Sequence, residues 1–157
     1  MRSTKVILFV LAILLCSCAE AYSECRTTGF SEEPVCEVSF FKLISDSKSY
    51  DGKLIELSGY YSVHLVEGKS KRFLFISKEA EFSADYGASV ELGGLSKEIP
   101  AERRPIFEQI LNRPELPLRI IGRLRLEQNK LQNGRKVLGV IEPLVGVSHV
   151  VPPPKKG

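Results

Sequence analysis

Two segments in which apolar and polar residues alternate constrain the fold more than any other feature of this chain. Residues 54–65 read LIELSGYYSVHL, and residues 116–128 read LPLRIIGRLRLEQ. A period of two predicts a β-strand with one buried face. Each segment also has a glycine at its centre, Gly59 and Gly122, on the predicted inner face. Such a glycine is typical of a strand that bends or bulges, as the strands of a small barrel must.

Three further strands and two helices are predicted around these segments. The other strands are expected at 72–77, with Phe73 and Phe75 on one face, at 88–94, and at 137–150, where Pro143 interrupts the pattern. Asn133-Gly134 is a hairpin signal before the last of them. Helical spacing follows Pro100 and ends before Pro114, and a shorter helix is expected after the capping residue Ser39. Its apolar face would comprise Phe40, Phe41, Leu43 and Ile44.

The predicted order is a short helix, three strands, a helix and two strands. That order is typical of the OB-fold, a five-stranded Greek-key barrel, so the predicted class is mainly β with one or two helices. Another five-stranded α+β arrangement is the alternative. The expected organisation is a signal peptide at 1–17, a leader or tether at 18–37, an OB-like domain at 38–150 and a flexible Pro/Lys tail at 151–157.

The segment from 38 to 149 also resembles a group of small bacterial exported OB-fold-like proteins. The resemblance is carried by a Tyr-x-Gly-Lys turn at 50–53 that leads into a strand with a glycine, and by a second strand with a glycine at 120–122. It implies a fold, and it supplies neither an activity nor binding residues.

The N-terminus predicts export, with two rival cleavage sites. Arg2 and Lys5 precede ten apolar residues, 6–15, a run too short to span a bilayer, which needs about 20 residues. Leu15-Cys16-Ser17-Cys18 resembles a bacterial lipobox, which would leave a lipoprotein acylated at Cys18 and anchored in the membrane of the cell envelope. Ala19-Glu20-Ala21 is an ordinary cleavage site, which would leave a soluble periplasmic or secreted chain. The lipobox is the favoured interpretation.

The cysteines retained after either cleavage predict one disulfide. Cys16 is removed with the signal, and Cys18 is either removed or acylated, so Cys25 and Cys36 have only each other. In an oxidising compartment this pair is expected to form a bond, with two free thiols as the alternative.

Few residues suggest chemistry or ligand binding. The two histidines, His64 and His149, lie on separate predicted strands, and no catalytic motif, cofactor fingerprint or metal-ligand spacing was identified. The chain is therefore expected to be neither an enzyme nor a metal or cofactor protein. Its 22 basic and 19 acidic residues nearly balance, so nucleic acid is a disfavoured partner. Candidate binding residues are Tyr60, Phe73, Arg119, Arg123 and Arg125.

The functional hypothesis is a non-enzymatic envelope module that binds a protein, peptide or glycan, or supports an assembly. The alternative is an exported domain that binds single-stranded nucleic acid through stacking rings and basic side chains. A charged outer face that only protects the barrel from edge-to-edge pairing is the simplest alternative to both.

Overall fold

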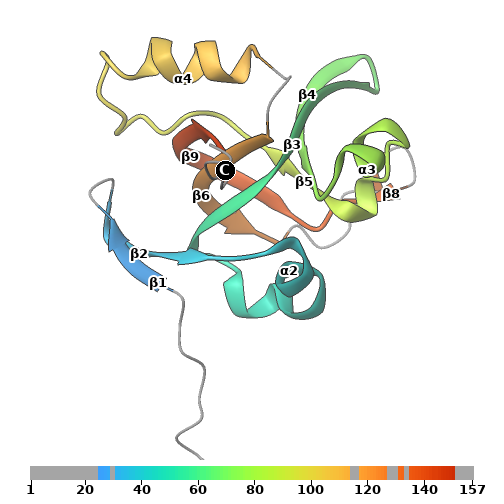
Figure 1. Cartoon of the computed structure of the whole chain (residues 1–157), viewed down its shortest axis with the longest axis horizontal. Coiled ribbons are helices and arrows are strands. Elements are labelled where there is room, and N and C mark those ends of the chain that lie inside the picture. Colours follow the sequence, from blue (N-terminus) through green and yellow to red (C-terminus); the bar gives the residue numbers. More distant parts are fainter. Residues whose placement is uncertain (1–24, 29–30, 114–116, 127–130, 133–134, 151–157) are drawn as a thin grey trace, which may run out of the picture.

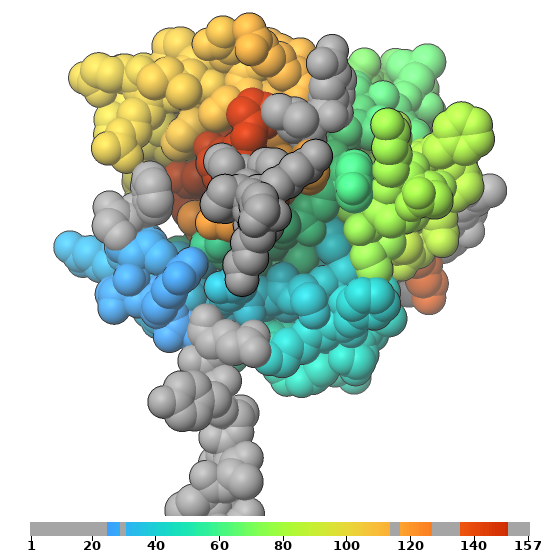
Figure 2. Space-filling model, viewed as in Figure 1, coloured from blue at the N-terminus to red at the C-terminus, as the bar shows by residue number. Residues whose placement is uncertain are grey.

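The computed structural model describes residues 25–28, 31–113, 117–126, 131–132 and 135–150. The predicted signal peptide, Cys18, the hairpin turn at 133–134 and the C-terminal tail lie outside these residues. The described residues are mainly β, with a seven-stranded mixed sheet and three short α-helices (Figure 1). Figure 2 shows the same face of the molecule in space-filling form. No helix in the described ranges is long and apolar enough to cross a membrane.

The strands of the main sheet are β1 (Cys25–Thr28), β2 (Ser31–Glu37), β3 (Leu54–Val66), β4 (Lys69–Phe75), β5 (Ser89–Leu92), β6 (Pro117–Arg125) and β9 (Val140–His149). A separate two-stranded sheet consists of β7 (Leu131–Gln132) and β8 (Arg135–Lys136). The α-helices are α2 (Phe40–Asp46), α3 (Lys78–Phe82) and α4 (Arg104–Leu111), and the 3-10 helices are η1 (Ser47–Tyr50) and η2 (Tyr86–Ala88).

Five of the strands pair in a cycle. β3 pairs antiparallel with β4, β4 with β5, and β6 with both β3 and β9, while β5 and β9 pair in parallel. α4 lies between β5 and β6 in the chain, as predicted. The inner faces form the main core, which α2 and α4 complete with Phe40, Leu43, Phe107 and Leu111.

The two central glycines lie where strands approach each other closely. A Cβ atom on Gly59 would lie 2.5 Å from the backbone oxygen of Phe75. A Cβ atom on Gly122 would lie 2.5 Å from the side chain of Ile141 and 2.8 Å from the backbone oxygen of Pro143. Gly122 also lies at a register shift between β6 and β9. Both positions therefore exclude any side chain. The predicted bulge has a counterpart at Gly122, where the register shifts.

The first described segment differs most from its predicted structure. Residues 25–37 lack periodicity, yet they form the β1–β2 hairpin, and the end of β2 pairs in parallel with the start of β3. The predicted disulfide is confirmed: Cys25 and Cys36 are bonded and are also register partners across the hairpin. Its 11-residue separation corresponds to about 3 kcal/mol in the chain-entropy model.

The face assigned to the second half of β3 is wrong. Ile55, Leu57 and Tyr61 are buried as predicted, but Val63 and Leu65 are 52% and 73% exposed. Beyond Tyr60 the opposite face is the more covered one: Ser62 and His64 are partly buried against α3 and η2, and Val66 is fully buried. Residues 78–82, interpreted from sequence as a polar connection, form α3, and its N-cap Ser77 accepts a hydrogen bond from the backbone N–H of Ala80.

Two further details correct the sequence interpretation. Ser39 caps α2 as predicted, accepting from the N–H of Lys42 at 3.2 Å, but the helix buries only Phe40 and Leu43. β9 also runs through Pro143 without interruption. The register of β9 against β6 shifts in that region, so the pairing there does not require the backbone N–H that proline lacks.

Candidate functional site

A groove on the outer face of β6 and β9 is the candidate site. Residues of the β1–β2 hairpin line it on one side, and residues of α4 and the preceding loop line it on the other. Figure 1 shows these two segments on either side of β6 and β9. The groove consists of two depressions, of about 380 Å³ and 770 Å³, which share Thr28 as a lining residue. The smaller is lined by Arg26, Thr27, Thr28, Glu56, Phe107, Arg119, Ile121 and residues 146–148. The larger extends toward Glu32, Glu33, Glu98 and Arg123.

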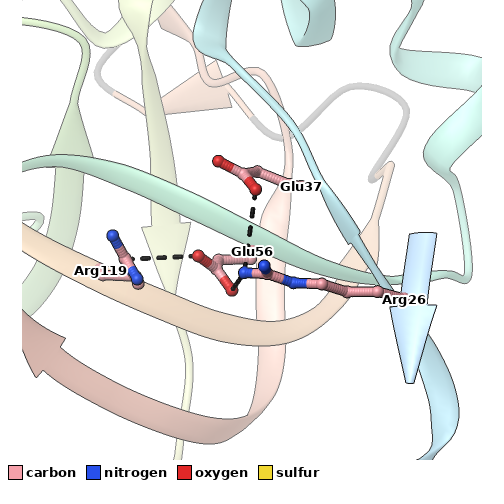
Figure 3. A network of polar contacts seen from close by, with 4 residues as sticks. All are labelled: Arg26, Glu37, Glu56 and Arg119. Carbon is pink, nitrogen blue, oxygen red and sulfur yellow. Dashed lines mark hydrogen bonds and ion pairs between the residues drawn. The ribbon is translucent and has the colours of Figure 1, made fainter. Parts of the chain in front are cut away.

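A buried carboxylate organises the smaller depression (Figure 3). The side chain of Glu56, on β3, is only 7% exposed. Its Oε1 lies 3.3 Å from Nε of Arg119, and its Oε2 lies 3.5 Å from a terminal nitrogen of Arg26, which also lies 3.8 Å from Glu37. A carboxylate buried this far is costly unless it is paired, and two guanidinium groups supply the pairing.

The two arginines keep contact with solvent although they share Glu56. Their side chains are 59% exposed for Arg26 and 46% exposed for Arg119. A guanidinium has five N–H donors in a rigid fork. The contact with Glu56 uses only some of the donors of each arginine. The arrangement therefore holds two cationic groups at the groove with donors available to a ligand.

Arg123 fixes the hairpin to the sheet at the larger depression. It donates at 2.7 Å to Glu33 on β2 and at 2.7 Å to the backbone oxygen of Gly52. Beneath these polar contacts, Val35, Leu54 and Ile121 form a small apolar cluster of their own. The outer face of β6, expected from sequence to be exposed, is thus partly covered by the hairpin.

The groove is electrostatically asymmetric. Arg26 and Arg119 lie at the smaller depression, whereas Glu32, Glu33 and Glu98 line the larger one around Arg123. Along β6 the two ends are four residues apart, about 13 Å at the rise of a strand. A ligand that follows the groove meets positive charge at one end and mainly negative charge at the other.

The structure separates the candidate binding residues into two groups. Arg119 and Arg123 are in the groove, and Arg125 is exposed at the end of β6. Tyr60 is half-buried and packs against a second cluster, in which Phe73 is fully buried. Phe73 therefore presents no ring to solvent, whereas Tyr60 lies on the same face of the sheet as Arg119, diagonally across from it in the register of β3 and β6.

The second cluster consists of aromatic rings covered by α3 and η2. Phe73, Phe75, Tyr86 and His64 lie with ring centroids 4.9–6.0 Å apart. The Tyr86 hydroxyl and Nδ1 of His64 form a hydrogen bond of 3.0 Å. Within the described residues, no group of three His, Cys, Asp or Glu side chains is arranged to hold a metal ion.

Sequence reasoning missed Arg26, Glu33 and Glu56. One of them had a usable signal: Glu56 is charged within the first alternating strand, and the first and fourth strands of the predicted barrel pair with each other. In the observed register Arg119 pairs with Ser58, so Glu56 is its diagonal neighbour. Arg26 and Glu33 had no such signal, because the hairpin that carries them lacks periodicity.

No protein-family model, curated protein or solved structure matches this chain.

Proposed function

We propose that this chain is a non-enzymatic OB-fold-like module of the bacterial cell envelope, anchored through lipid on Cys18, that binds an extended peptide segment of another envelope protein in the groove. The barrel assignment is supported by the cyclic pairing of β3, β4, β5, β9 and β6, with a helix between the third and fourth of these strands in the chain. That cycle and that helix position are the ones expected for the fold.

The observation that carries the proposal is the pair of half-exposed arginines held by one buried carboxylate. Glu56 already restrains both arginine side chains. Binding a ligand therefore costs less arginine side-chain entropy than it would if the two arginines moved freely. Guanidinium donors suit carbonyl and carboxylate oxygens, which an extended peptide presents along its length.

The charge asymmetry favours a peptide with charges of both signs. An acidic side chain at Arg26 and Arg119 and a basic side chain at Glu32 and Glu98 would match the two ends of the groove. Arg119 and Arg123, which mark the two depressions on β6, are about 13 Å apart, a span of about four residues of extended chain.

A glycan or single-stranded nucleic acid fits the groove less well. Both are typically held by stacking on exposed aromatic rings. The aromatic residue among the described lining residues of the groove, Phe107, is 8% exposed, and Phe73 lies under α3. The nucleic-acid alternative predicts salt-dependent binding of short single-stranded DNA.

Site-specific photocrosslinking tests the proposal. Ser148 is exposed in the groove opposite Arg119, so a benzophenone amino acid at this position should crosslink to a partner in intact cells. Phe82, 91% exposed on α3, is the control position. We expect a protein adduct at 148 and none at 82, with the crosslinked segment carrying an acidic and a basic residue about four apart. A nucleic-acid or glycan adduct, or equal adducts at both positions, would contradict peptide binding.

The anchoring part of the proposal has its own test. The intact mass of the mature protein should correspond to an N-terminal acylated Cys18. A mature chain that starts at Tyr22 without lipid would establish the alternative, a soluble form cleaved after Ala21.

A further inference from the structure

α2 presents two large apolar side chains to solvent. Phe41 is 77% exposed and Ile44 is 50% exposed, while Phe40 and Leu43 of the same helix are buried in the main core. Residues three apart on a helix lie on one face, so the exposed pair forms a single apolar strip. Two basic residues, Lys42 and Lys48, are close to this strip in the sequence. The acidic residue between them, Asp46, has a carboxylate that accepts a hydrogen bond from Ser49.

The disulfide places the attachment point of the tether next to this helix. Cys25 is bonded to Cys36, which precedes Phe41 by five residues. The tether enters the described structure at Cys25, so its end is covalently held close to the start of α2. β1, β2 and α2 accordingly lie at the same end of the molecule in Figure 1.

The tether is short if Cys18 carries the lipid. Cys25 lies seven positions after Cys18, and a fully extended chain spans at most about 25 Å over that length. Cys25 therefore cannot move further than this from the membrane surface, a distance smaller than the diameter of the domain itself.

We propose that α2 rests on the bilayer surface, with Phe41 and Ile44 inserted among the lipid headgroups and Lys48 near their phosphates. This inference rests on the anchoring part of the proposed function. Two apolar side chains make only a weak contact with a membrane on their own. A short tether turns that contact into an intramolecular one at high effective concentration. The docked helix would then hold the β1–β2 wall of the groove in one orientation near the membrane.

The test uses the absence of tryptophan from the chain. Phe41→Trp introduces a single reporter on α2, and Phe82→Trp introduces one at a similarly exposed site on α3. The chain 18–157 contains every described residue, and Cys18 is its only cysteine outside the disulfide. Coupling Cys18 to a maleimide lipid in vesicles of phosphatidylcholine and phosphatidylglycerol therefore supplies the anchor without cellular lipidation.

With brominated acyl chains in the vesicles, we expect the Phe41→Trp variant to lose fluorescence and to shift its emission to shorter wavelength. The Phe82→Trp variant should change in neither respect. Ile44→Trp should behave like Phe41→Trp and provides a second reporter. Equal quenching at 41 and 82, or no quenching at 41 and 44, overturns the inference. Because the anchor is supplied chemically, these results are independent of whether the mature mass shows lipid on Cys18.

Discussion

The ion-pair network around Glu56 leads to an asymmetric prediction for stability. Glu56 is 7% exposed, but its partners Arg26 and Arg119 are about half exposed. In Glu56→Gln both arginines can rehydrate and the amide oxygen still accepts a hydrogen bond, so we expect a loss of about 1 kcal/mol in the free energy of unfolding, as for partly exposed pairs. In Arg26→Met/Arg119→Met the apolar stems remain but the buried carboxylate loses both partners, which should cost about 3 kcal/mol.

A triple variant separates this explanation from a general loss of packing. Adding Glu56→Gln to the double methionine variant removes the unpaired buried charge, so the triple variant should be more stable than the double by about 2 kcal/mol. Equilibrium unfolding in urea at neutral pH, with the disulfide intact, measures all four proteins. If the triple variant is no more stable than the double, Glu56 is not a buried charge that depends on the two arginines, and the reasoning fails.

Three further predictions concern the rest of the fold. Cys25→Ser/Cys36→Ser should lower the free energy of unfolding by about 3 kcal/mol, measured in urea, and the unchanged protein under reducing conditions should show the same loss. Gly59→Ala should cost about 2–3 kcal/mol, because its Cβ would meet a β4 backbone oxygen. Gly94→Ala, where a Cβ meets nothing within 4 Å, is the matched control in the same urea assay and should be near neutral. Burial raises the pKa of Tyr61 above its ordinary 10.0. The folded state thus favours the neutral phenol, and its contribution to stability falls as pH rises above about 10. Thermal unfolding should show that Tyr61→Phe loses less stability than the unchanged protein over that range.

The five strands of the cycle and their order could be predicted because they follow local patterns. β3 and β6 each alternate over several residues, and such a pattern appears in the sequence whatever surrounds it. The cap of α2 at Ser39 and the position of α4 between Pro100 and Pro114 are likewise local signals. The disulfide could be predicted from cysteine number alone, since the predicted export would leave one pair.

The errors lie where burial depends on a distant segment. Val63 and Leu65 continue the alternation of β3, but α3 and η2 bury the opposite face of that half-strand through the aromatic cluster. Nothing within residues 54–65 indicates which face another segment will cover. α2 shows the same limit, because the core has room for Phe40 and Leu43 and leaves Phe41 exposed.

Residue spacing and residue count were enough to specify the alternating strands, the two glycines at their centres and the cysteine pair. The candidate site, in contrast, arises from the tertiary arrangement. Arg26 and Glu56 are 30 residues apart, and Arg123 and Glu33 are 90 residues apart. Their contacts exist because the β1–β2 hairpin folds against β3 and reaches the outer face of β6. Ionic contacts of this kind leave no periodic signal, since they depend on where whole strands lie in space.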